Sequence, residues 1–234
     1  MRDGSENRKN RTKRWLRRLA AGLLSAALAL GLTACGGAAA GNGSGSGNNS
    51  GDGVPAQTEY GVFLSYEGDL SALAAYETVV IDAQYYTKEQ IAAFQKQGHK
   101  VYTYINVGSL EDFRPYYDEY KDLALGTYEH WEEEVWMDAA DPRWQDFLLK
   151  ELAPELRGKG VDGFFVDNCD VYCNYPRRSI LKGLTVIMKG LREGDMPVLI
   201  NSGNDFLDAY CEGGGDPRDV VTGINQETVF SAID

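Results

Sequence analysis

Apolar and polar positions alternate in blocks after residue 58, in a repeated strand–helix pattern. Short apolar runs predict strands at 60–66, 78–82, 100–106, 163–167, 197–201 and 219–224. Helical patterns lie between them, at 88–97, 115–123, from 142 onward, at 179–192 and at 204–210. Thr87 can cap the first helix and Pro142 suits the first turn of the third, in which Pro154 must produce a kink or an early end. This alternation implies βαβ units and a parallel sheet.

The ends of the predicted strands favour a barrel over a doubly wound sheet. Polar or aromatic side chains stand at or just past the carboxyl ends: Tyr66, Asp82, Asn106, Asp167, Asn201 and Glu227. A barrel builds its site from many strand ends, whereas a doubly wound sheet uses one crevice. We therefore expect an α/β fold of the (β/α)8 TIM-barrel type, C-terminally incomplete and truncated after about six strands, since a full barrel needs about 250 residues.

The first 34 residues have the pattern of a secretory signal peptide. Eight basic residues among the first 18 precede an apolar stretch at 19–32, which is shorter than the roughly 20 residues of a transmembrane helix. Leu32-Thr33-Ala34-Cys35 looks like a bacterial lipobox, in which Cys35 is lipidated; an ordinary cleavage site followed by a chance cysteine is the alternative. The expected location is the outer side of a bacterial cytoplasmic membrane. Residues 35–58 predict a flexible Gly/Ser/Asn tether, and 59–234 the folded domain.

Charge and cysteine content limit the possible partners. The net charge is −12, and it becomes −18 without the first 34 residues, which hold eight basic and two acidic residues. This acidity argues against nucleic acid, and it suits either a cationic ligand or simple solubility. After Cys35 the chain has Cys169, Cys173 and Cys211, with no CxxC pair and two histidines in all, so we predict no zinc site. A Cys173–Cys211 disulfide and free thiols both stay open.

Two carboxylates are the candidates for chemistry. Asp167 ends the apolar run of segment 162–170 (DGFFVDNCD), and Glu227 follows the last predicted strand. Two carboxylates that face each other across a pocket can divide acid and nucleophile roles, as in glycoside hydrolysis. In other interpretations Asp167 and Asp170 cap a loop and Glu227 is a surface residue, or a divalent cation is held by Asp82, Asp167 and Asp170. We predict no cofactor and no metal.

Five sequence blocks resemble glycoside hydrolase family 114, the endo-α-1,4-polygalactosaminidase family. They are VVIDAQYY (79–86), KVYTYINVGSLEDFRPYY (100–117), VWMDAADPRW (135–144), GVDGFFVDNCDVY (160–172) and NQE (225–227). The resemblance implies a (β/α)8 barrel that cleaves α-1,4-linked galactosamine polymers, which are cationic amino-sugar polysaccharides, as an endo-acting glycosidase.

Residue roles follow from the same resemblance. It places the nucleophile on Asp167 and the general acid/base on Glu227, and a sugar subsite on Asp82, Tyr104, Asp170 and Asn201. Glu111 and Arg114 fit either substrate contacts or a structural ion pair. The segment 107–140 is expected to be a long loop around the short helix at 115–123. Its aromatic residues can stack on sugars or pack the loop onto the barrel: Tyr116, Tyr117, Trp131 and Trp136. We expect a lipid-anchored glycoside hydrolase, with a non-catalytic cell-surface carbohydrate-binding lipoprotein as the alternative.

Overall fold

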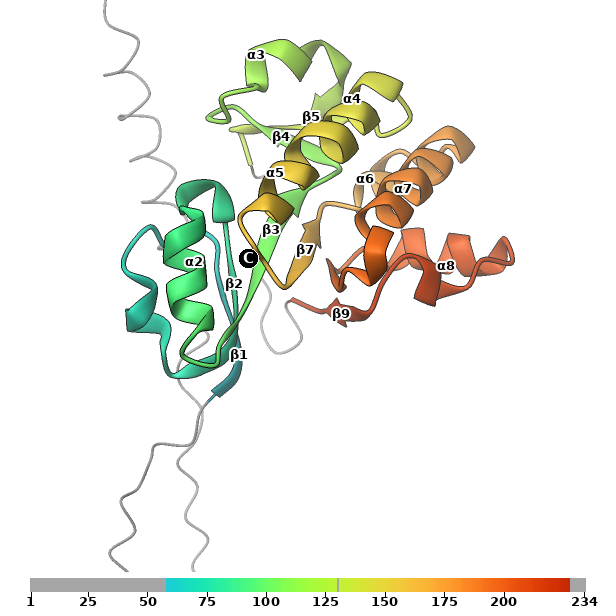
Figure 1. The fold of residues 1–234 in the computed structure, drawn as a ribbon. Helices are drawn as coiled ribbons and strands as arrows, with labels where there is room; N and C mark the ends of the chain where they lie inside the picture. The colour runs from blue at the N-terminus through green and yellow to red at the C-terminus, as the bar shows by residue number, and fades with distance from the viewer. Residues whose placement is uncertain (1–57, 130, 228–234) are drawn as a thin grey trace, which may run out of the picture.

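Six parallel strands form a half-barrel in the computed structural model, which describes residues 58–129 and 131–227. The strands follow the order β1-β2-β3-β7-β8-β9, so each strand lies beside its predecessor along the main sheet (Figure 1). Their bounds are β1 (Thr58–Phe63), β2 (Tyr76–Ile81), β3 (Lys100–Asn106), β7 (Gly163–Asp167), β8 (Val198–Asn201) and β9 (Gly223–Asn225). The predicted signal peptide, Cys35 and all of the tether except Thr58 lie outside the described residues.

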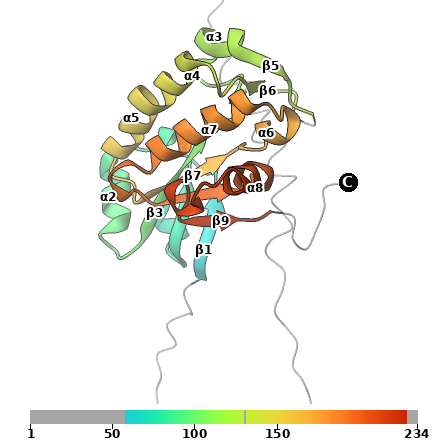
Figure 2. The ribbon, with the colours of Figure 1, turned by 90° about the vertical axis from the view of Figure 1, so that its right-hand side faces the viewer.

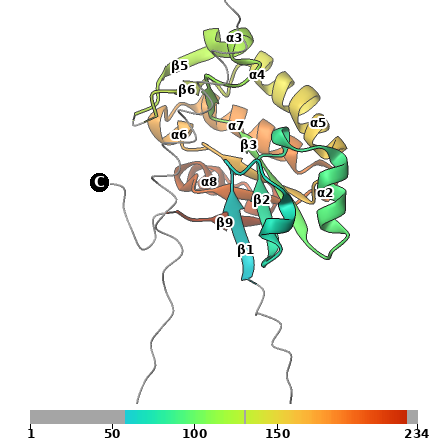
Figure 3. The same cartoon turned by 90° about the vertical axis from the view of Figure 1, so that its left-hand side faces the viewer.

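Helices cover the outer face of this sheet. They are α2 (Lys88–Gln95), α4 (Pro142–Asp146), a π-helical turn (Phe147–Leu152), α5 (Ala153–Gly158), α6 (Val171–Asn174), α7 (Arg178–Leu191) and α8 (Asn204–Glu212). Short 3-10 segments lie at Leu70–Leu73, Ala83–Tyr85, Lys121–Leu123, Glu193–Asp195 and Pro217–Asp219. Figure 2 shows α7 and α8 on the side of β7 and β9, and Figure 3 shows β1 and β2 on the opposite side, with α2 beside them. None of the described helices is both long and apolar enough to cross a bilayer.

Alternate residues of each strand point to two different cores. The main core lies between sheet and helices, where strand residues such as Ile81 and Phe164 meet α2, α5 and α7. The inner face carries a smaller cluster, in which Val80, Tyr104 and Phe165 are buried. Inward-pointing side chains of this kind fill the interior of a barrel.

A small antiparallel sheet lies beyond the carboxyl end of β3. Its order is β4-β6-β5, with β4 (Ser109–Glu111), β6 (Glu134–Met137) and β5 (Ala124–Thr127), and α3 (Tyr117–Tyr120) accompanies it. All three overall views place this sheet and α3 at one end of the molecule. It therefore adds side chains at the end of the half-barrel where the parallel strands finish.

The predicted fold class is confirmed, and most elements differ from the prediction only at their ends. Thr87 caps α2 in a capping box with Gln90, and Gly98 follows this helix with a φ of 99°, where a side chain would be strained. Pro142 is in the first turn of α4. Pro154, which cannot donate a backbone hydrogen bond, follows the π-helical turn, and the helix continues past it to Gly158.

Two predictions about elements were wrong. The strand expected at 219–224 is shorter and later, because a 3-10 turn occupies Pro217–Asp219 and β9 begins only at Gly223. The short helix expected at 115–123 is present as α3 and the 3-10 segment after it, but the rest of the segment 107–140, expected to be a loop, forms the antiparallel sheet. Its strands have three or four residues, which is too short for a clear periodic pattern.

Gly183 of α7 lies in close contact with the backbone of a neighbouring segment, and Gly158 of α5 offers a control without such a contact. A Cβ on Gly183 would lie 2.1 Å from the backbone oxygen of Ala139, whereas a Cβ on Gly158 would have no neighbour within 4 Å. We expect Gly183→Ala to lower the free energy of unfolding by roughly 1–3 kcal/mol through overpacking. Gly158→Ala should raise it by roughly 0.4–1 kcal/mol, because alanine restricts the unfolded chain. Urea denaturation measures both, and equal effects would contradict the close contact of α7 with residue 139.

Candidate active site

Asn201 joins the two predicted catalytic carboxylates. Its Nδ2 donates one hydrogen bond to Asp167 Oδ1 at 3.0 Å and another to Glu227 Oε1 at 3.1 Å. Asn225, at the end of β9, donates to Asn201 Oδ1 at 2.7 Å and so fixes the orientation of the amide. The ends of β7, β8 and β9 therefore bring Asp167, Asn201 and Glu227 together, as the sequence predicted.

The bridging amide limits the distance between the carboxylates. The two oxygens that accept these hydrogen bonds, Asp167 Oδ1 and Glu227 Oε1, lie at most about 6 Å apart, because one NH₂ group donates to both of them. The second donor to Asp167 is the backbone N–H of Asn168, at 3.0 Å, and it also uses Oδ1. Within the described residues, Oδ2 of Asp167 is thus the oxygen without a hydrogen bond.

The environment of Asp167 favours its protonated form. Burial raises the pKa of this carboxyl to about 7, the Asn201 hydrogen bond opposes that rise, and the Glu227 charge adds to it. Burial also raises the pKa of Asp170, whose carboxylate accepts a hydrogen bond from the Gly203 backbone. Asp170 precedes α6 but makes no capping hydrogen bond with its side chain, so it is not simply a helix cap. Glu227 is exposed.

Asp82 and Glu111 form a buried ion cluster with Arg114. Arg114 Nη1 lies 2.6 Å from Asp82 Oδ2, and Nη2 lies 2.9 Å from Glu111 Oε1, with all three side chains at most 4% exposed. Burial alone would raise the pKa of Glu111, but the adjacent guanidinium holds it below its usual range. Glu111 and Arg114, for which the sequence left substrate contacts and a structural ion pair open, thus form the ion pair. Because Asp82 is held by Arg114, it does not share a cation with Asp167 and Asp170.

Tyr104 belongs to the same buried cluster. It is 6% exposed, and its hydroxyl donates to Glu111 Oε1 at 3.2 Å. Tyr104 and Asp82 were both predicted to contact sugar. In this structure both residues are buried and bind members of the ion cluster, Asp82 to Arg114 and Tyr104 to Glu111. Their direct contact with a sugar stays a prediction.

A chain of polar side chains links the small sheet to the loop after β7. Ser109 Oγ donates to Glu134 Oε2 at 2.6 Å and accepts from Asn168 Nδ2 at 2.9 Å. Asn106 also donates to Ser109 Oγ, at 2.7 Å. Asn168 has a φ of 64° and its backbone N–H binds Asp167, so this chain ends at the candidate nucleophile. Burial and the nearby Glu111 charge raise the pKa of Glu134 to about 8.

Glu134, Ser109 and Tyr128 were missed by the sequence analysis. Tyr128 donates to Asn168 Oδ1 at 3.1 Å and stacks on Trp136, with ring centroids 3.9 Å apart. The signal that could have indicated Glu134 is the alternation in β6, which places Glu134 and Trp136 on one face of the strand.

Two of the predicted loop aromatics pack the loop onto the barrel. Trp136 is buried against Tyr128, and Tyr116 lies against Phe147 with ring centroids 4.5 Å apart. Neither arrangement requires a sugar, so packing is the role that the structure gives these two rings.

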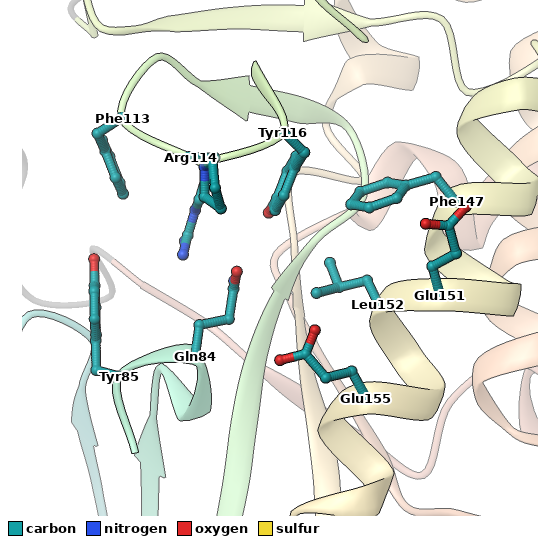
Figure 4. A pocket seen from close by; sticks show the side chains of 10 residues that line it. Gln84, Tyr85, Phe113, Arg114, Tyr116, Phe147, Glu151, Leu152 and Glu155 are labelled. Atoms are coloured by element: carbon teal, nitrogen blue, oxygen red, sulfur yellow. The ribbon is translucent and has the colours of Figure 1, made fainter. Parts of the chain in front are cut away.

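A cavity of about 320 Å³ adjoins the ion cluster. Figure 4 shows Gln84, Tyr116 and Glu155 directed toward one another across it, from the segment after β2, the loop after β4 and α5. Its lining includes Arg114 but not Asp167, Asn201 or Glu227. The cavity is therefore separate from the carboxylate pair.

The described residues hold neither a metal-ligand cluster nor a disulfide between Cys173 and Cys211. Across residues 58–129 and 131–227, no group of three or more His, Cys, Asp and Glu side chains is arranged to hold a metal ion. Cys169 is buried and free, and Cys173 and Cys211 are exposed and free. The Cys173–Cys211 disulfide is thus not formed in this structure.

Parallel strands that carry paired carboxylates at their carboxyl ends define a glycosidase-type barrel. The comparisons with known proteins agree with this class. The sequence profile of glycoside-hydrolase family GH114 matches residues 44–210, and the chain belongs to that family. Glu227 lies beyond the matched range. Among curated proteins, no sequence matches significantly.

Solved structures with the same fold include two glycoside hydrolases of microbial origin. The glycoside hydrolase domain of PelA from Pseudomonas aeruginosa is 22% identical with a TM-score of 0.61, over 75% of this chain and 69% of that chain. Ega3 from Aspergillus fumigatus, solved in complex with galactosamine, is 25% identical with a TM-score of 0.57, over 71% of this chain and 68% of that chain. A family GH13_31 enzyme, 9% identical, has a TM-score of 0.54 over 76% of this chain and 53% of that chain.

Removing the buried guanidinium should destabilise the fold. Arg114→Met would leave Asp82 and Glu111 buried without a cation, which costs about 3–5 kcal/mol of unfolding free energy. The matched control is Arg143→Met, because Arg143 pairs with Asp122 on the surface, with side chains 52% and 60% exposed. Urea denaturation should show a large loss for Arg114→Met and little change for the control. Similar midpoints for the two variants would argue against a structural role of the ion cluster.

Proposed function

We propose that this protein is a glycoside hydrolase that cleaves α-1,4-linked galactosamine polysaccharide in an endo fashion with retention of configuration. The observation that carries the proposal is the pair formed by Asp167 and Glu227, which one amide of Asn201 holds within about 6 Å. Carboxyl pairs are about 5–5.5 Å apart in retaining glycosidases and about 6.5–9.5 Å apart in inverting ones. The limit of about 6 Å between the two accepting oxygens therefore favours the shorter, retaining spacing.

The two residues would act in two steps. In the first, Asp167 Oδ2 forms a bond to the anomeric carbon while the glycosidic C–O bond breaks, and Glu227 gives its proton to the leaving oxygen. In the second, water attacks the anomeric carbon, Glu227 takes the water proton, and the Asp167 carboxylate is released. Asn201 and the Asn168 backbone hold Oδ1, which orients Oδ2 for the attack.

Charge and relatedness support the substrate class. A galactosamine polymer carries ammonium groups, and a domain this acidic attracts cations. The related Ega3 was solved with galactosamine, which is consistent with an amino-sugar substrate. We further propose that a lipid on Cys35 holds the enzyme at the outer side of the membrane, since the lipobox-like segment precedes the tether.

Substitution of either carboxylate tests the assignment. Asp167→Asn and Glu227→Gln should each lower kcat on galactosamine oligomers by about 10²–10⁴-fold, because each removes a bond-forming or proton-transferring group. Asp208→Asn, which makes the same change at an exposed residue of α8, is the control and should retain activity. Proton NMR of the wild-type reaction should show that the first product keeps the substrate's anomeric configuration. Full activity in either carboxylate variant, or an inverted product, would refute the proposal.

The pH dependence should report Asp167. The nucleophile acts ionised and its pKa is about 7, so kcat/KM should fall as the pH drops below about 7. The Asn201 hydrogen bond lowers this pKa, so Asn201→Ala should shift the acidic limb to higher pH. Titration of substrate amines affects both enzymes equally, so the difference between the two pH profiles isolates the protein group. An unchanged acidic limb would show that Asn201 does not control the ionisation of Asp167.

A further inference from the structure

Glu134 is a carboxylate in the site that the proposed two-step reaction does not use. It comes from β6 of the small sheet, and Ser109 and Asn168 link it to Asp167 through hydrogen bonds. Building on the proposed function, we propose that Glu134 binds the 2-ammonium group of a sugar unit and so selects galactosamine over N-acetylgalactosamine.

The hydrogen bonding of Glu134 leaves one oxygen available. In the described part of the chain, Ser109 is the donor to Oε2, at 2.6 Å, and Oε1 has no side-chain or backbone donor. Glu134 is half-buried, and its Oε1 is not fully buried, unlike the unpaired Glu111 Oε2. An unpaired carboxylate oxygen that is partly exposed can accept a hydrogen bond from a ligand.

Hydrogen bonds place Tyr128 and Glu134 beside the residue that follows the candidate nucleophile. The Tyr128 hydroxyl donates to Asn168 Oδ1 at 3.1 Å. Asn168 Nδ2 donates to Ser109 Oγ, which in turn donates to Glu134 Oε2. Burial raises the pKa of Tyr128, and the charges of Asp167 and Glu134 add to that rise. Glu134 therefore lies near Asp167, at the end of the half-barrel.

The other carboxyl groups of this region are paired with a cation, take part in the proposed reaction or accept a backbone hydrogen bond. Arg114 neutralises much of the charge of Asp82 and Glu111. Asp167 and Glu227 carry the proposed chemistry, and the Asp170 carboxylate accepts a backbone hydrogen bond from Gly203. Glu134 has a hydroxyl partner, Ser109, and within the described residues it forms no ion pair, because Arg114 pairs with Asp82 and Glu111. It is therefore the carboxyl group that a cationic ligand can pair with.

An ammonium group and an acetamide group differ in what they offer to this carboxyl. An ammonium donates charge-assisted hydrogen bonds, which are about twice as strong as neutral ones. Its positive charge also favours the ionised form of Glu134, whose pKa is about 8 in the ligand-free protein. An acetamide is neutral and bulkier, so it gains neither effect.

The experiment compares Glu134→Gln with the wild-type enzyme on two matched oligomers, one of galactosamine and one of N-acetylgalactosamine. Glutamine keeps an oxygen for Ser109 and removes the charge. We expect the ratio of kcat/KM, galactosamine over N-acetylgalactosamine, to fall by about tenfold, mainly through KM, because the variant loses a charge-assisted hydrogen bond to the ammonium group. Glu129→Gln makes the same substitution at an exposed residue between β5 and β6 and should leave the ratio unchanged.

Equilibrium binding of both oligomers to Glu227→Gln, with and without Glu134→Gln, separates the two proposals. If wild-type enzyme hydrolyses neither oligomer but the binding preference is lost with Glu134, the proposed function fails and this inference holds. An unchanged preference, or an equal loss for both oligomers, overturns the inference while wild-type hydrolysis leaves the proposed function intact. Thermal melting of Glu134→Gln identifies any loss that comes from unfolding alone.

Discussion

The buried guanidinium of Arg114 makes it possible to gather carboxylates at the end of this half-barrel. Ionised carboxylates are costly to bury unless they are paired, and Asp82 and Glu111 are both almost fully buried. Arg114 binds both of them and so connects the end of β2 to β4. Because β4 pairs with β6, the same interaction fixes the small sheet that carries Glu134. The position of the site thus depends on one cation.

The main sheet could be predicted because its signal is local. Apolar runs such as those of β3 and β7 are buried on both faces, and capping residues such as Thr87 mark helix starts without any knowledge of the fold. The last strand was misplaced because Val220 and Val221 are buried without belonging to a strand. The small sheet was missed because its pairing, Glu111 with Glu134 for example, depends on long-range contacts.

The candidate site was predictable in its centre and not in its surroundings. Strand ends alone pointed to Asp167, Asn201 and Glu227, because parallel strands finish on one side of the sheet. Asp82 also stands at a strand end in the sequence, and only its ion pair with Arg114 distinguishes it from Asp167 and Asn201. The link from Ser109 to Asn168 joins residues 59 positions apart, so no local pattern contains it.

The distribution of charge explains how one acidic region can serve two purposes. Glu111 faces Glu134 across β4 and β6, and like charges in that position destabilise a sheet. Arg114 lowers the pKa of Glu111, and the Glu111 charge then raises that of Glu134. One member of the pair is thereby kept ionised, while burial and the Glu111 charge favour the protonated form of the other. The two carboxyl groups can therefore lie opposite each other in the small sheet without both being charged.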